Sequence, residues 1–84
     1  MSKVEKLFDK IRNNPRNVRF NDICKLAETF GFEYKGGRGS HKLYMKKSVN
    51  EMLNFQNVNG MAKPYQVRQF LNIIEENGLK LKED

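Results

Sequence analysis

The sequence GGRGSH at positions 36–41 contains the residue types best suited to chemistry on a phosphate group. Glycine lets the backbone approach another chain closely and adopt positive φ angles. Arg38 carries a permanent, planar charge that matches phosphate oxygens. His41 is the single histidine of the chain, and histidine is the side chain that exchanges protons most readily near neutral pH. This run therefore predicts a place where a phosphodiester is bound and cut.

Of the phosphodiesters that such a site could cut, RNA requires the fewest catalytic groups from the protein. The 2′-hydroxyl of RNA is a built-in nucleophile, so a ribonuclease must supply only proton transfer and positive charge for the transition state. We assign the proton transfer to His41. The charge stabilisation falls to Arg38, Lys42 and the backbone amides of Gly39 and Ser40. Positioned acid–base catalysis contributes roughly 10²–10⁴-fold to a rate, so these groups predict a slow nuclease that needs no metal.

Lys63 extends the predicted substrate site, because it precedes a predicted helix and a helix N-terminus attracts anions. One histidine and one cysteine, without clustered carboxylates, fall short of a typical metal-ligand set. We therefore expect no metal and no other cofactor. Cys24 is expected to be a small, half-buried hydrophobe in a helix.

Purely structural interpretations of the same residues remain open. A lone histidine such as His41 often caps a strand or satisfies a core contact, and hairpin connections use glycine for their geometry alone. Tyr34 and Tyr44 are expected either to stack on a base or to pack, as aromatic residues in strands commonly do.

The composition indicates one small domain, residues 1–84, that is attracted to an anionic partner. Sixteen Lys and Arg residues against ten acidic residues give a formal net charge of +6. No long apolar run is present, so we expect neither a signal peptide nor a membrane contact. A single cysteine permits no internal disulfide, which suits a reducing cytoplasm and predicts a cytoplasmic protein.

Three segments show the apolar spacing i, i+3, i+4, i+7 that predicts amphipathic helices. Their apolar residues are Val4, Leu7, Phe8 and Ile11 in the first, Ile23, Leu26, Ala27 and Phe30 in the second, and Val67, Phe70, Leu71 and Ile74 in the third. Asn21 is the expected N-cap of the second helix. Pro64 is expected to open the third helix, and Gly31 and Gly78 to end the second and third.

Between the second and third helices the pattern alternates with the period of a strand. Strands are expected over residues 32–35, 40–46 and 52–57, with the glycine run as a hairpin connection and residues 47–51 as a second connection. One sheet face, packed under the helices, is expected to hold Phe32, Tyr34, Leu43, Met45, Leu53 and Phe55. His41 is expected on that same side, at the end of the sheet. The predicted fold is α+β, with a three-stranded antiparallel sheet.

The α-β-β-β-α order, with Gly39-Ser40-His41 opening the second strand, resembles the HicA family of bacterial toxins. Residues 20–32, 39–44 and 63–71 carry the resemblance, which covers residues 18–79; residues 1–17 form an N-terminal helical extension. The resemblance implies a fold like the double-stranded RNA-binding domain. It implies the toxin component of a type II toxin–antitoxin system, a metal-independent endoribonuclease that cleaves mRNA with His41 as its catalytic residue. It also implies a cognate HicB-like antitoxin protein as partner. Many family members carry a second histidine where this chain has Lys42.

Two functions of other classes fit the same residues. A non-catalytic module for double-stranded RNA would use the same fold and charge through shape and phosphate contacts. A protein-interaction domain would use its positive charge to meet an acidic partner. The first helix is expected to pack on the domain, or alternatively to share in an oligomer or antitoxin contact.

Overall fold

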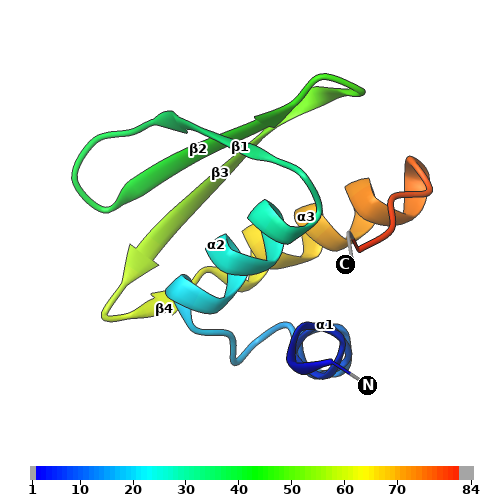
Figure 1. The fold of residues 1–84 in the computed structure, drawn as a ribbon. Coiled ribbons are helices and arrows are strands. Elements are labelled where there is room, and N and C mark those ends of the chain that lie inside the picture. The colour runs from blue at the N-terminus through cyan, green and yellow to red at the C-terminus, as the bar shows by residue number, and fades with distance from the viewer. Residues whose placement is uncertain (1, 82–84) are drawn as a thin grey trace.

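The computed structural model describes residues 2–81, which form three helices and a four-stranded antiparallel sheet. The elements are α1 (Lys3–Asn13), α2 (Phe20–Thr29), β1 (Glu33–Gly36), β2 (His41–Lys46), β3 (Val49–Val58), β4 (Met61–Ala62) and α3 (Pro64–Glu76). The strands lie in the order β1-β2-β3-β4. The helices cover one face of the sheet, and the opposite face carries no helix (Figure 1). The predicted α+β class is therefore confirmed.

The helix ends follow the signals in the sequence with one exception. Gly31 (φ 94°) and Gly78 (φ 60°) follow α2 and α3 in the left-handed conformation that ends a helix. The exception is α2, which begins at Phe20, so the prediction of Asn21 as its N-cap is wrong. The Phe20 N–H donates to the Gly60 carbonyl at 3.0 Å. A contact with the β3–β4 turn thus fixes this helix end without a side-chain cap.

The sheet has one strand more than the three that the sequence predicts. The turn Asn59–Gly60 has positive φ at both positions (54° and 85°), as a tight hairpin requires. It returns the chain along β3 as β4, which has only two residues. The other edge of β4 is also paired, because the Ala62 N–H donates to the Val18 carbonyl at 2.8 Å. A strand this short leaves no alternation to detect in the sequence.

The strand β2 presents to the helices the opposite side from the one predicted. Tyr44 is only 1% exposed, and it pairs with Leu53 on the side of the sheet that the helices cover. Because successive side chains of a strand alternate, Leu43 and Met45 lie instead with His41 on the uncovered face. These three side chains are half-buried there.

The buried position of Tyr44 is stable because its polar atom has a partner. The Tyr44 hydroxyl donates to the Glu28 carboxylate at 2.8 Å, and its ring packs 5.9 Å from that of Phe55. The prediction for β3 is confirmed, since Leu53 and Phe55 face the helices and are buried. The strand runs over residues 49–58, so only positions 47 and 48 form the turn before it.

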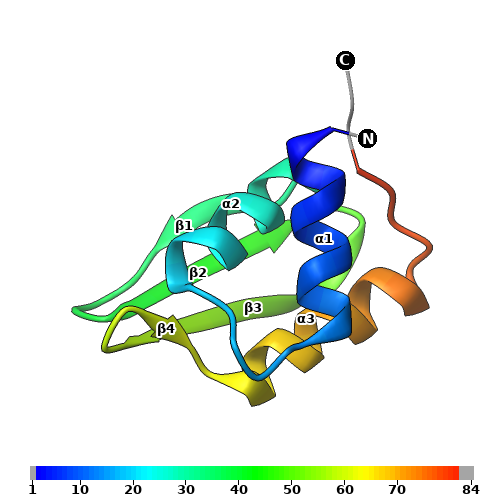
Figure 2. The ribbon, with the colours of Figure 1, turned by 90° about the horizontal axis from the view of Figure 1, so that it is seen from below.

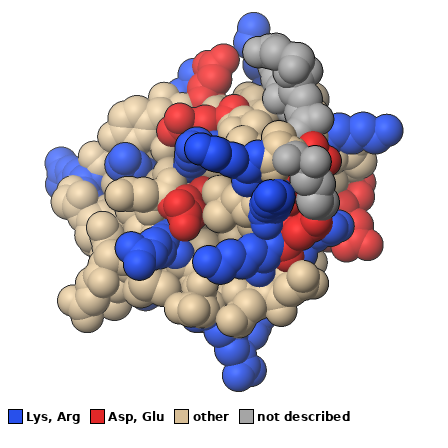
Figure 3. Space-filling view, turned by 60° about the horizontal axis from the view of Figure 1, so that its bottom comes forward, with Lys and Arg blue, Asp and Glu red and all other residues tan. Residues whose placement is uncertain are grey.

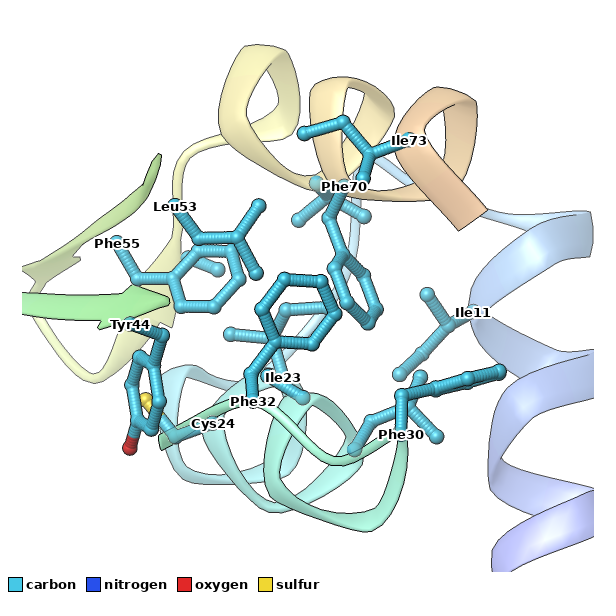
Figure 4. Close-up of a cluster of buried hydrophobic side chains, with 14 of the residues drawn as sticks. Ile11, Ile23, Cys24, Phe30, Phe32, Tyr44, Leu53, Phe55, Phe70 and Ile73 are labelled. Carbon is cyan, nitrogen blue, oxygen red and sulfur yellow. The ribbon is translucent and has the colours of Figure 1, made fainter. Parts of the chain in front are cut away.

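One hydrophobic cluster joins the sheet to the helices (Figure 4). The Phe70 ring of α3 lies at its centre, 5.9 Å from Phe30, 6.0 Å from Phe32 and 5.8 Å from Phe55. These centroid distances and the steep angles between the rings are typical of favourable edge-to-face aromatic pairs. Phe70 is thus one α3 side chain that contacts both the end of α2 and the sheet within the shared core.

The N-terminal helix α1 packs on the domain, as the first of the two alternatives predicts (Figure 2). Its N-terminus is closed by a capping box between Ser2 and Glu5. Ile11 is 2% exposed, and the Phe8 ring lies 5.1 Å from Phe30. The apolar side of α1 is thus part of the same core.

Candidate active site

The connection between β1 and β2 is a tight turn with unpaired backbone donors. The His41 N–H donates to the Arg38 carbonyl at 2.9 Å, and the Asn57 N–H donates to the Ser40 carbonyl at 2.8 Å. Within residues 2–81, the N–H groups of Arg38, Gly39 and Ser40 have no acceptor. All three residues are exposed, so these amides are available to an anion such as a phosphate.

Gly37 sets the distance between this turn and the start of β2. A Cβ atom on Gly37 would lie 2.1 Å from the His41 carbonyl oxygen and 3.1 Å from the Lys42 Cα. The close approach is possible only without a side chain. The backbone of the glycine run therefore rests directly against the backbone of the candidate catalytic residue.

His41 lies on the uncovered face of the sheet, at the end nearest the glycine turn. It opposes Gln56 of β3, and its Nδ1 lies 3.3 Å from the Asn54 Oδ1. The amide oxygen is an acceptor, so this contact favours the tautomer that carries its proton on Nδ1. That tautomer leaves Nε2 as a proton acceptor. The ring is half-buried rather than sealed in the core, so a nucleotide has a route to it.

Lys42 does not share a face with His41. It opposes Phe55 on the helix side of the sheet. Its Nζ lies 5.7 Å from the centre of the Phe20 ring and 5.8 Å from that of Tyr34. The structure therefore separates Lys42, which the sequence interpretation assigns to charge stabilisation, from the proposed proton-transfer residue His41.

Lys63 is exposed and lies at the same end of the sheet as the glycine turn. It is the N-cap residue of α3 and makes no side-chain cap itself. Ser40 is hydrogen-bonded to Asn57, which in turn opposes Ala62, the residue before Lys63. Neighbouring strands lie about 4.8 Å apart, so this path spans roughly 10 Å. A phosphate chain of a few nucleotides is long enough to contact both the turn and Lys63.

A second polar cluster, formed by Tyr44, Glu28 and Cys24, lies between the sheet and the helices. Burial raises the pKa of Tyr44, and its hydrogen bond to Glu28 raises it further. Burial also raises the pKa of the Cys24 thiol, against a smaller opposing effect of its hydrogen bond with Tyr44. Cys24 is 5% exposed, so it is fully buried rather than half-buried as predicted. Tyr44 packs in the core and is not free to stack on a base.

Basic side chains are spread widely over the helix side of the molecule, with acidic ones between them (Figure 3). Charge alone therefore does not mark the site, and the case for it rests on the local geometry around His41. Residues 2–81 contain no cluster of three or more side chains able to hold a metal ion. None of the helices in this part of the chain is long and apolar enough to cross a membrane.

The arrangement at the glycine turn combines a proton acceptor with exposed donors and cations at one end of the sheet. Asn54 is the member that the sequence interpretation missed, because its role depends on the register between β2 and β3. No protein-family model, curated protein or solved structure gives a significant match to this chain.

Proposed function

We propose that this protein is a metal-independent endoribonuclease with His41 as its general acid and base. The observation that supports this most directly is the half-buried imidazole on an uncovered sheet face, with Nδ1 held against Asn54. In the proposed reaction, Nε2 accepts the proton of the ribose 2′-hydroxyl. The 2′-oxygen attacks the neighbouring phosphorus, and the bond to the 5′-oxygen breaks. The products are a 2′,3′-cyclic phosphate and a 5′-hydroxyl, which takes the proton from the imidazolium.

The negative charge that develops on the phosphoryl oxygens is stabilised by the glycine turn. The proposed donors are the exposed amides of Gly39 and Ser40 and the guanidinium of Arg38, all in the turn that leads directly into His41. Lys63 binds another phosphate farther along the RNA. Lys42 has no part in this charge stabilisation, since it lies on the opposite side of the sheet.

The resemblance to HicA supports a biological setting for this activity. The arrangement of α2, the sheet and α3 is proposed to be a variant of the double-stranded RNA-binding fold, with α1 added. The protein is then the toxin of a type II toxin–antitoxin pair in the cytoplasm. Its substrate is mRNA, and a cognate HicB-like antitoxin restrains it.

The test is cleavage of an RNA in EDTA by the wild-type protein and by His41→Ala. The wild type should produce ends with a 2′,3′-cyclic phosphate and leave DNA of the same sequence intact. His41→Ala should lose cleavage by at least about a hundredfold while it binds RNA as before. Lys47→Ala, at the far end of β2, is the control and should cleave normally. Cleavage of DNA, or activity only with a divalent metal, would refute the proposal.

A non-catalytic RNA-binding module is the second candidate. It is favoured by one observation, that no second titratable side chain is hydrogen-bonded to His41 within residues 2–81. Under this alternative RNA binds tightly at low salt, yet no cleavage is seen with the wild type. An acidic protein partner as the sole ligand is the third outcome, recognised by weak RNA binding even at low salt.

A further inference from the structure

The helix side of the sheet carries a second aromatic and cationic surface next to the glycine turn. It is formed by Tyr34 of β1 and Lys42 of β2, with the buried Phe20 ring of α2 beneath Lys42. Tyr34 is 55% exposed, unusually open for an aromatic side chain in a sheet. Its ring is nevertheless fixed, because it packs edge-on against the buried Tyr44 ring at 5.8 Å. An exposed ring held by a buried neighbour is a preorganised stacking platform.

Lys42 supplies a cation at a defined position over one face of the Tyr34 ring, which leaves the other face for a base. Its Nζ lies close to two aromatic rings, at 5.7 and 5.8 Å from their centres. It takes part in no ion pair within residues 2–81, whose salt bridges are Arg12–Asp9 and Lys35–Glu33. The charge of Lys42 is therefore not neutralised by a carboxylate contact and is available to an anion.

We propose that Tyr34 and Lys42 form a subsite for an unpaired nucleotide of the RNA, next to the phosphate that is cut. The base stacks on Tyr34, and the phosphate of that nucleotide contacts Lys42. The Cα atoms of His41 and Lys42 lie about 3.8 Å apart, but their side chains point to opposite faces. The RNA therefore passes around the end of the sheet, at the glycine turn, to contact both. The RNA passes from the uncovered face of the sheet, where it is cut, to the helix side, where it is bound. This inference rests on the proposed RNA substrate.

The test compares RNA affinities by fluorescence anisotropy in the His41→Ala background, where the labelled single-stranded oligonucleotide stays intact. Tyr34→Leu should weaken binding roughly fivefold to a hundredfold, the range found when one stacked base loses its aromatic partner. Tyr34→Phe keeps the ring and should bind within about twofold of the parent. Tyr65→Leu is the matched control, because Tyr65 is also exposed (69%) but lies on α3. It should leave the affinity unchanged.

The lysine contribution is tested with two variants that change the net charge equally. Lys42→Gln should lower the slope of log affinity against log salt by about 0.7, the value for one phosphate contact on a single strand. Lys47→Gln, in the turn at the far end of β2, should leave that slope unchanged. Circular dichroism melts confirm that each variant remains folded.

The outcomes separate the subsite from the catalytic proposal. If Tyr34→Leu and Tyr65→Leu bind RNA equally well, or the two lysine variants show the same slope, the subsite is refuted, whatever the activity of His41. If the wild type cuts no RNA but Tyr34→Leu and Lys42→Gln bind weakly, the nuclease is refuted and the subsite stands.

Discussion

The Nδ1 atom of His41 and the Oδ1 atom of Asn54 lie 3.3 Å apart across β2 and β3, on the uncovered face of the sheet. The contact depends on the antiparallel register, in which His41 opposes Gln56 and Leu43 opposes Asn54. Asn54 is therefore a diagonal neighbour of the histidine. Its side-chain oxygen contacts the imidazole from β3, which makes it a positioning residue for the proposed reaction.

Replacing Asn54 by Leu should reduce kcat about two- to tenfold, because a single side-chain hydrogen bond contributes about 0.5–1.5 kcal/mol. KM should change little, since Asn54 is not proposed to contact RNA. Steady-state cleavage of a short RNA measures both constants. Asn50→Leu, on the same strand and face but near its start, is the control and should behave as the wild type. A rise in KM with constant kcat would instead make Asn54 a substrate contact.

Gly37→Ala should be far more damaging than a substitution at Gly39. A methyl group on Gly37 meets the His41 carbonyl at 2.1 Å, so the turn must move. We expect a loss of about 1–3 kcal/mol in the free energy of unfolding together with loss of RNA cleavage. Gly39 has φ 57° and open space around it, and Asn59 already adopts φ 54° in this chain.

Gly39→Asn should therefore lie within about 1 kcal/mol of the wild type in stability, because asparagine tolerates the left-handed conformation. Chemical denaturation and the cleavage assay measure both variants. Equal effects of Gly37→Ala and Gly39→Asn would show that the close approach does not constrain the site.

The stability of the protein should fall at alkaline pH through Cys24 and Tyr44. Burial raises both pKa values in the folded state above their ordinary values of 9.0 and 10.0. Between the unfolded and folded pKa values, the unfolded chain has lost a proton that the folded chain keeps. The stabilisation is thus complete below pH 9 and is lost progressively as the pH rises above it.

Denaturation curves between pH 7 and pH 11 should show this decline in the wild type. The double variant Cys24→Ala, Tyr44→Phe should decline less steeply, although it is less stable at neutral pH. Tyr65→Phe, which changes an exposed tyrosine, is the control and should decline like the wild type. If the stability of the wild type and of the double variant fell equally with pH, Cys24 and Tyr44 would not be the cause of the decline.

Phe70→Ala should cost about 3–5 kcal/mol, the usual range for removal of a fully buried phenylalanine. Phe70 is 0% exposed and contacts three other rings, so its loss leaves a cavity between α3 and the sheet. A domain of this size has about 5–15 kcal/mol of total stability, so a large drop in Tm is expected. Phe70→Leu keeps most of the volume and should lose less. Equal melting temperatures for the two variants would refute the central role of this side chain.

The helices were predictable because each contains several apolar residues at helical spacing with a clear end signal. Gly31 and Gly78 end α2 and α3 where the sequence indicates. The start of α2 was not predictable, because the hydrogen bond from Phe20 to Gly60 links residues distant in the chain.

The face of β2 was the main error, and its cause is chemical. Leu43 and Met45 alternate with Lys42 and Tyr44, so hydropathy favours the wrong side for burial. Tyr44 takes the core position because Glu28 of α2 accepts a hydrogen bond from its hydroxyl group. A partner supplied by another element cannot be read from alternation within one strand.

The sequence revealed which residues form the candidate site, but not that His41 lies on the uncovered face of the sheet. The glycine run and His41 were evident from residue type, because their chemistry does not depend on register. The separation of His41 from Lys42 follows from strand alternation alone, because neighbouring residues of β2 point to opposite faces. Only the identity of the covered face depended on contacts with other elements.

The hydrogen bond from Ala62 to Val18 has a consequence for the behaviour of the protein at high concentration. Residues before α2 occupy the outer edge of β4, so the sheet cannot be extended there by another molecule. The opposite edge of the sheet is β1, which has four residues, begins with Glu33 and carries Lys35. On the β4 side, β3 extends beyond β4, and there the Gln56 N–H donates to the Gln66 side chain of α3 at 2.7 Å. Short, charged edges resist strand-to-strand aggregation. The β1 and β4 edges are thus both protected against strand addition, while one face of the sheet stays open to solvent.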